Sequence, residues 1–211
     1  MIDSNTLQYS VLETLNVSRE TFDDFEKFRE LILLKNKKMN LISQSTEKNS
    51  KERHIIDSAQ IIDFIDKNEN VCTDIGSGSG LPGIVLAIIM KHKKASMKFN
   101  LYEKSFRKSE FLNYAIEKLK INAEVFQKNI FEEKNLVTDI MVARAFKPLP
   151  TILELAKDNF KKFKSIILFL GRSGENHLSN SFKTWNFELK EKKSITNPDS
   201  KIVKIYNLKK L

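Results

Sequence analysis

The segment from Val71 to Ile88 holds the residues whose types and spacing point most directly to ligand chemistry. It reads VCTDIGSGSGLPGIVLAI, and four of the chain's six glycines lie in it, between Gly76 and Gly83. Glycine is costly inside strands and helices, but it is useful where a backbone turns sharply or lets a ligand approach closely. The pattern Asp74-x-Gly76-x-Gly78-x-Gly80 therefore predicts a ligand-binding loop.

The loop differs from the dinucleotide fingerprint G-x-G-x-x-G, because Leu81 stands where the third glycine would be required. Asp74 also places a negative charge where a pyrophosphate would be repelled. A ligand with a positive charge, or with hydroxyl and amine groups, suits this loop better. S-adenosylmethionine, with its ammonium and sulfonium groups, meets that description, so we expect Asp74, Gly76, Gly78 and Gly80 to bind it. A tight turn that binds nothing is the alternative.

The flanks of the loop indicate how it is positioned. Residues 71–75 read as a buried strand, and residues 81–90 read as an apolar helix with Pro82 in its first turn. Downstream, apolar strand patterns alternate with helical patterns; the strands are expected at 98–102, 123–126, 139–143, 165–170 and 202–206, and the helices at 83–91, 107–119 and 149–160. This alternation predicts an α/β fold with a mostly parallel sheet and helices on both faces.

Both ends of the chain depart from this alternation. Residues 1–70 read as helical, with an apolar stripe from Phe22 to Leu33, a start capped by Ser18 or Thr21, and a second helix at 53–65. We expect them to form a helical N-terminal subdomain packed on a ligand-binding domain of residues 71–211. The last segment reads as two strands joined by a turn near Asn197, which predicts an antiparallel edge of the sheet.

A second acid follows the strand at 98–102. Glu103 lies 27 residues after Gly76, roughly one strand–helix–strand repeat later. An acid at this strand end is placed to accept hydrogen bonds from the two hydroxyls of a ribose. An ordinary surface glutamate would be the alternative, but the glycine loop one repeat earlier favours a ribose contact.

Composition and charge limit the classes of protein that fit. The 211 residues suit one large domain, no apolar run is long enough to span a membrane, and the first residues lack the pattern of a secretory signal. We therefore expect a cytoplasmic protein, and a monomer. The lone Cys72 fits a core position, and three dispersed histidines predict no metal site.

The net charge of +9 raises the question of a polyanionic partner. Lysines cluster at 35–38, at 91–94 and at 190–193. Such clusters could bind nucleic acid, or they could simply keep the surface solvated.

Five segments taken together resemble one known family. They are NLIS (40–43), RHIIDS (53–58), DIGSGSGLPGI (74–84), LYEKSFRKSEFL (101–112) and ARAFKPL (143–149). In this order and spacing they resemble the RsmG (GidB) family of methyltransferases that act on small-subunit ribosomal RNA. The resemblance implies a Rossmann-like class I methyltransferase fold and transfer of a methyl group from S-adenosylmethionine to N7 of a guanine in that RNA, either free or in a ribosomal subunit particle.

The same resemblance implies cofactor contacts at Gly76, Leu81, Ile130, Phe131 and Arg144. Two positions depart from the family pattern. Glu103 replaces the usual aspartate, although the longer acid still reaches a diol. Near residue 170 the family tends to carry Lys-Gly, whereas Leu170-Gly171-Arg172 stands here, so Arg172 either supplies the missing charge or lies at a position that is not essential.

Guanine N7 carries a free lone pair, so its methylation needs alignment rather than a strong general base. Arg144 follows an expected strand end and is our candidate catalytic residue; it could hold a phosphate, the guanine edge or the cofactor carboxylate. Arg53, His54 and Asp57 share one helix region, where they could contact substrate or tie the N-terminal helices to the body as a polar cluster.

Three other functions compete with this expectation. The first is an S-adenosylmethionine-dependent methyltransferase of another RNA, a protein or a small molecule, which shares the loop and Glu103 but needs no basic surface. The second is a nicotinamide-dependent oxidoreductase, which Asp74 and Leu81 argue against. The third is a non-catalytic RNA-binding protein, which has no reason to keep an intact glycine loop.

Overall fold

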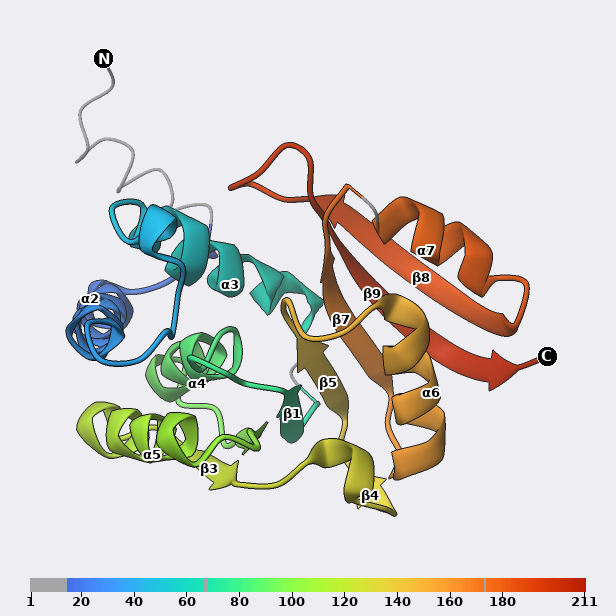
Figure 1. The fold of residues 1–211 in the computed structure, drawn as a ribbon, viewed down its shortest axis with the longest axis horizontal. Helices are drawn as coiled ribbons and strands as arrows, with labels where there is room; N and C mark the ends of the chain where they lie inside the picture. The colour runs from blue at the N-terminus through green and yellow to red at the C-terminus, as the bar shows by residue number, and fades with distance from the viewer. Residues whose placement is uncertain (1–14, 67, 173) are drawn as a thin grey trace.

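A seven-stranded sheet forms the centre of the protein in a computed structural model, which describes residues 15–66, 68–172 and 174–211 (Figure 1). The strand order is β3-β2-β1-β5-β7-β9-β8, parallel from β3 to β7 and antiparallel for β9 and β8. The strands of this sheet are β1 (Val71–Ile75), β2 (Lys98–Tyr102), β3 (Ala123–Phe126), β5 (Ile140–Ala143), β7 (Ser165–Leu170), β8 (Trp185–Lys193) and β9 (Lys201–Lys210). The mostly parallel sheet and its antiparallel edge confirm the α/β expectation.

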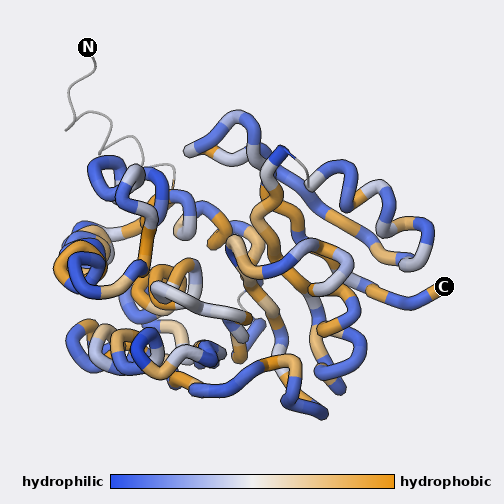
Figure 2. Tube along the Cα trace, in the orientation of Figure 1, coloured by the Kyte–Doolittle hydropathy of each residue, from blue (hydrophilic) through white to orange (hydrophobic). Residues whose placement is uncertain are grey.

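Helices cover both faces of the sheet, because successive residues of each buried strand point to opposite sides. Ile140 and Val142 of β5 pack with one hydrophobic cluster, while Met141 and Ala143 pack with the other. The first cluster includes α4 (Gly83–His92) and α5 (Phe106–Leu119), and the second includes α6 (Leu149–Asn159) and α7 (Gly174–Ser181). The apolar segments gather toward the inside of the trace in Figure 2.

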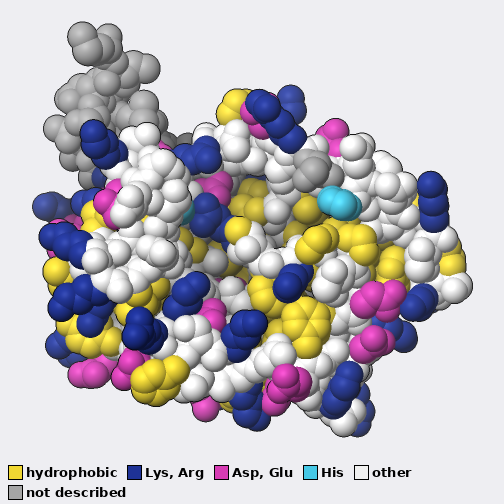
Figure 3. Space-filling model, viewed as in Figure 1, with side chains coloured by type: hydrophobic (Ala, Val, Ile, Leu, Met, Phe, Trp, Pro, Cys, Tyr) yellow, Lys and Arg dark blue, Asp and Glu magenta, His cyan; other side chains and the backbone are white. Residues whose placement is uncertain are grey.

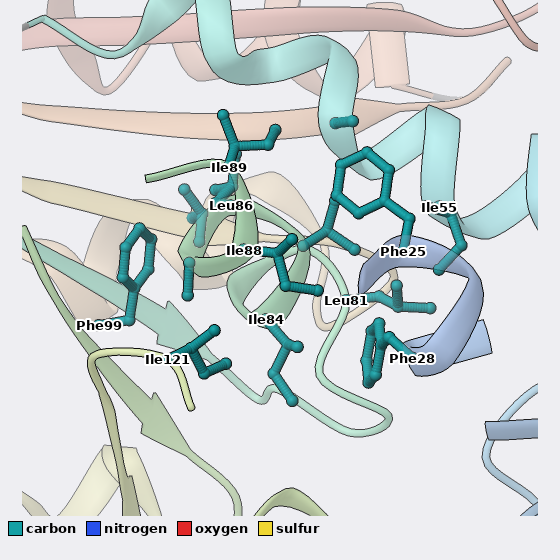
Figure 4. Packing of buried hydrophobic residues seen from close by; sticks show 14 of the residues in the cluster. Phe25, Phe28, Ile55, Leu81, Ile84, Leu86, Ile88, Ile89, Phe99 and Ile121 are labelled. Atoms are coloured by element: carbon teal, nitrogen blue, oxygen red, sulfur yellow. The ribbon is translucent and has the colours of Figure 1, made fainter. Parts of the chain in front are cut away.

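The described part of the N-terminal region is helical. Its elements are α2 (Arg19–Asn36), η1 (Gln44–Thr46), η2 (Lys51–Ile56), α3 (Asp57–Ala59) and η3 (Gln60–Phe64). Ser18 caps α2, since its side chain accepts a hydrogen bond from the backbone N–H of Thr21. Phe25 and Phe28 of α2 pack against α4 beside Ile55 (Figure 4). This region therefore shares a core with the α/β body. The domain division at residue 70 stays a prediction. The helical structure expected for residues 1–14 also stays a prediction, because these residues lie outside the described ones.

Several elements differ from the sequence expectation. The helix read from residue 81 beside the loop begins at Gly83, as the expected range 83–91 has it, with Pro82 as its N-cap. The helix expected at 53–65 is a succession of π, α and 3-10 turns. Helix α7 was missed because Leu178 is its only large apolar residue, so no periodic pattern exists. Short segments η4 (Ile130–Glu132), β4 (Leu136–Val137) and β6 (Phe160–Lys162) were also missed.

Candidate functional site

A cavity of about 990 Å³ opens at the carboxyl ends of the parallel strands. Its walls include residues at the ends of these strands, namely 76–79 and 81 after β1, 103–104 after β2, 128–131 after β3, 144–147 after β5 and 170–171 at the end of β7. The N-terminal helical region and the turn between β8 and β9 contribute most of the rest. In open α/β sheets this edge is where ligands bind. The volume lies near the upper end of the range for small-molecule sites, which leaves room for a cofactor and a second group beside it.

The glycine loop presents bare backbone to this cavity. Gly78 has a φ of +58°, and a Cβ placed on it would meet nothing closer than the carbonyl oxygen of Gly76 at 3.8 Å. A Cβ on Gly76, where φ is +73°, would collide with the ring of Phe146. A side chain at either position would be strained and would fill the cavity or displace its wall. The loop thus leaves space for close approach by a ligand, and the binding role expected from the sequence stays a prediction.

Glu103 lies beside the loop and is nearly buried, at 8% exposure. Its Oε2 accepts a hydrogen bond from the N–H of Gly78 at 2.9 Å, and its Oε1 accepts one from the N–H of Ser105 at 2.8 Å. A carboxylate has about four acceptor positions. The remaining ones are available to two hydroxyl donors, so the site fits a ribose diol.

Asp74 and Gly80, both expected beside the ligand, do not line the cavity. Asp74 is 1% exposed, and its Oδ2 accepts a hydrogen bond from the N–H of Gly83 at 2.9 Å, so it braces the start of α4 from beneath the loop. Burial raises the pKa of Asp74 to about 7. Gly80 is needed because a Cβ there would collide with Ile84. Both residues shape the loop from behind, where sequence spacing alone could not separate them from the ligand-facing positions.

Arg144 leaves the end of β5 and lies in the cavity wall. Its Nε donates to Oδ2 of Asp57 at 3.0 Å, and its Nη2 donates to the carbonyl oxygen of Arg53 at 2.7 Å. Both of its Nη atoms also lie 3.3 Å from Nδ1 of His54. The four residues singled out in the sequence therefore meet on one wall of the cavity, with Arg144 binding the other three.

His54 is held in one tautomer by its neighbours. Because arginine has only donors, Nδ1 of His54 must accept, and its Nε2 then donates to Oγ1 of Thr46 at 2.8 Å. Burial, followed by the charge of Arg144, lowers the pKa of His54 to about 4. The imidazole ring is consequently neutral near pH 7, so it does not repel the charge of Arg144.

Asp57 joins Arg144 to the turn between β8 and β9. Its Oδ1 accepts from Nε2 of Gln60 at 2.8 Å and from Oγ of Ser194 at 3.3 Å, and it also accepts from Oγ1 of Thr196. The C-terminal hairpin and the N-terminal helical region are thus tied together through the carboxylate that positions Arg144. The sequence pattern at 194–196 gave no signal for this contact, because the residues are more than 130 positions away from Asp57.

Aromatic rings also line the cavity. Phe131 and Phe146 stack with their centroids 5.9 Å apart, and Phe169 lies under the guanidinium of Arg144 at 6.0 Å. Ile130 also lines the cavity, and Asn159 donates to the carbonyl oxygens of Ile130 and Phe131, which fixes this segment. The sequence analysis did not single out Phe146 or Phe169. For Phe146 the available signal was its place two positions after Arg144, at the end of a strand.

Arg172 lies outside the lining of this cavity. Its side chain is 82% exposed and pairs with Asp199 at 2.6 Å, outside the cavity lining. Whether Arg172 supplies charge to the substrate site or lies at a position that is not essential stays a prediction. Leu170 and Gly171 reach the cavity instead, because β7 ends before Arg172.

Lysines surround the mouth of the cavity. Lys104, Lys108, Lys128 and Lys147 line it, and dark blue side chains ring the hollowed centre of the face shown in Figure 3. Within the described residues, no cluster of histidine, cysteine and acidic side chains is arranged to hold a metal. None of the helices described is long and apolar enough to cross a membrane.

Comparisons with known proteins give the family context of this geometry. The family model GidB, described as rRNA small subunit methyltransferase G, matches residues 21–205. A ribosomal RNA small subunit methyltransferase G from Pelagibacter ubique is 48% identical over 204 residues, covering 96% of each chain. Another from Cereibacter sphaeroides is 36% identical over 202 residues, covering 94% of this chain and 97% of its own.

Solved structures show the same fold at low sequence identity. TrmK from M. capricolum, in complex with S-adenosyl-homocysteine, has a TM-score of 0.54 at 16% identity and covers 71% of this chain and 66% of its own. An S-adenosylmethionine-dependent methyltransferase from Aquifex aeolicus has a TM-score of 0.54 at 14% identity and covers 76% of this chain and 92% of its own. These two structures confirm the expected Rossmann-like methyltransferase fold.

Proposed function

The chain belongs to the GidB family of small-subunit ribosomal RNA methyltransferases G, and we propose that it transfers a methyl group from S-adenosylmethionine to N7 of a guanine in small-subunit ribosomal RNA. The observation that carries the proposal is the meeting of the Gly76–Gly78 loop, Glu103 and Arg144 in one cavity at the carboxyl ends of the strands. The guanine and its N7 atom come from the family resemblance.

The cofactor binds between the glycine loop and Glu103. Gly78 leaves the cavity floor open, and Glu103 accepts from the ribose hydroxyls with the lone pairs that Gly78 and Ser105 do not use. Ile130 and Phe131 enclose the adenine end beside them. When bound, S-adenosylmethionine supplies a methyl group on a positively charged sulfonium.

The remaining residues of the site align the base rather than deprotonate it. N7 of guanine has a lone pair and no proton to lose, so no general base is required. This agrees with the state of the cavity wall, where His54 and Asp57 are both engaged in hydrogen bonds with Arg144. Alignment of two bound groups can lower the activation barrier by on the order of 7–11 kcal/mol.

Arg144 and the aromatic rings provide this alignment. The guanidinium of Arg144 is oriented by three neighbours and lies close to Phe169, while Phe146 lies between Gly76 and Phe131. A guanine ring has a face for stacking on Phe146, and its O6 can accept from Arg144 while the N7 lone pair stays free to attack the methyl group. In A-form RNA the N7 edge lies in a deep and narrow groove, so the target base must be unpaired or extruded from its stack.

Mapping of methylated nucleotides tests the function directly. Small-subunit RNA from cells with and without the protein should differ by one methyl group on one guanine, and the purified protein should restore it on free RNA or on the subunit particle. A methyl group on another atom would replace the N7 assignment. Transfer only to proteins or small molecules would favour the alternative substrate classes.

A further inference from the structure

A second hollow lies next to the main cavity, and a loop and a helix turn connect the two. Its lining includes Lys37, Lys38 and Arg107, whereas Leu41, Lys104 and Lys108 line the main cavity. The loop 36–42 and the first turn of α5 thus contribute to both walls. The two hollows are therefore neighbours along the same two segments.

The cations along this path are free of ion pairs with the described acids. Lys37, Lys38, Lys104, Arg107 and Lys108 form no salt bridge in the described part of the chain. The first turn of α5 contains no acid. The acids near the path are Glu47, which lines the second hollow and accepts from Asn36, and Glu103, which accepts from the N–H groups of Gly78 and Ser105. Farther along α5, Glu110 and Glu117 are exposed. The path therefore has an excess of positive charge that the described protein does not neutralise.

The outer face of α5 adds exposed aromatic rings to this charge. Phe106, next to Arg107 on the first turn, is 60% exposed. Tyr114 on the same helix is 38% exposed, but Lys35 and Lys118 already lie over its ring at 5.4 and 5.5 Å. The exposed Phe182 stacks on Phe187. Phe106 is thus an exposed aromatic ring for which the described residues provide no stacking or cationic partner.

We propose that this surface, made of Lys37, Lys38, Lys104, Phe106, Arg107 and Lys108 and called here the flank surface, binds the unpaired nucleotides next to the target guanine. One flanking base stacks on Phe106, and the phosphates on either side of it contact the cations. Exposed aromatics interleaved with cations bind single-stranded nucleic acid in this way. The inference rests on the proposed function, because the RNA that binds the flank surface is the substrate of that reaction.

The location of the other lysine clusters supports this choice. Lys93 and Lys94 follow the carboxyl end of α4, while its amino end lies at the glycine loop, so about 15 Å of helix separates them from the cavity. Lys91 of that cluster is paired with Asp24, and Lys192 of the C-terminal cluster is paired with Asp63. The cluster at Lys37 and Lys38 is the one that reaches a hollow beside the site.

Steady-state methyl transfer to a transcript of small-subunit RNA tests the stacking contact. Phe106→Leu keeps an apolar side chain but removes the flat ring, so the KM for RNA should rise about tenfold, while kcat and cofactor affinity stay unchanged. Phe106→Trp should restore the wild-type KM. Leu34→Ala, at an equally exposed position on α2, is the matched control and should change none of these values.

Salt titration of RNA binding separates the phosphate contacts from the stack. The log–log slope should become shallower by about 0.7 per lost contact in Arg107→Gln and in the pair Lys37→Gln with Lys38→Gln. It should stay unchanged in Phe106→Leu and in the control pair Lys93→Gln with Lys94→Gln.

Two results would overturn the flank surface: a wild-type KM in Phe106→Leu, or equal salt slopes in the two lysine pairs. A wild-type enzyme that leaves this RNA unmethylated, free and in the particle, would instead overturn the proposed function, and no variant is needed to see it.

Discussion

Nε of Arg144 lies 3.0 Å from Oδ2 of Asp57, a residue 87 positions earlier in the chain. This ion pair joins the end of β5 to the start of α3, and its two side chains are only 20% and 13% exposed. A pair this shielded from solvent holds its geometry far better than a surface pair does. Arg144 therefore enters the cavity in a fixed orientation that depends on the N-terminal helical region.

Replacement of Arg144 by lysine should separate charge from geometry. Lysine keeps the positive charge but loses the planar fork that binds Asp57, His54 and the Arg53 carbonyl together. We expect the rate of methyl transfer to fall at least about tenfold, because the guanidinium no longer aligns the base with the methyl group. Circular dichroism should show an intact fold. Arg172→Lys is the matched control, since Arg172 is exposed and outside the cavity. Equal activity in both variants would make Arg144 a structural residue.

Gly78→Val should abolish cofactor binding without unfolding the sheet. The branched side chain would enter the open cavity at a backbone φ of +58°, which a β-branched residue adopts only with strain. Calorimetry with S-adenosylmethionine measures the loss, and RNA binding checks that the protein is folded. Unchanged cofactor affinity in the folded variant would place the cofactor elsewhere.

Glu103→Gln should weaken the cofactor about tenfold, because hydrogen bonds to a charged group contribute roughly 1.5–3 kcal/mol against about 1 for neutral ones. Glu103→Asp restores the acid but shortens it, so it should recover affinity only if the contact with Gly78 at 2.9 Å can re-form. Calorimetry of both variants decides this. Wild-type affinity in Glu103→Gln would exclude a ribose contact at this position.

Asp74 should make the protein less stable as the pH rises. Burial, with a contribution from the charge of Glu103, raises the pKa of Asp74 from 3.8 to about 7. Between those values the folded chain binds more protons at this site than the unfolded chain, so the free energy of unfolding declines with pH. Asp74→Asn should remove a decline of about 2–3 kcal/mol between about pH 5 and pH 8. Urea unfolding at several pH values measures it, and parallel curves for both proteins would contradict it.

His54 should have the opposite effect on the acid side. Its pKa is lowered from 6.5 to about 4, so its contribution is complete above about pH 6.5 and is lost as the pH falls toward 4. His54→Gln keeps an acceptor for Arg144 and a donor for Thr46 but cannot titrate. The variant should therefore lose less stability than the wild type between about pH 6.5 and pH 4, as measured by the same unfolding experiments. If the free energy of unfolding falls as much below about pH 6.5 in the variant as in the wild type, His54 is not the group responsible.

The sequence by itself determined the α/β class, the glycine loop and the approximate position of Glu103. These features depend on local rules: period-two and helical apolar patterns, the freedom of glycine, and the fact that parallel strands end at one edge. The strands at 71–75, 98–102 and 123–126 lie where the pattern predicted them.

Only the tertiary structure decided which residues of the motifs face the ligand. Asp74 and Gly78 are four positions apart, yet one is buried under the loop and the other faces the cavity, because loop backbone angles rather than spacing set these directions. The pairing of Arg144 with Asp57, and of Asp57 with Ser194 and Thr196, was equally hidden. Such contacts join segments distant along the chain, and they form only when the whole sheet and its helices bring three loops to one edge.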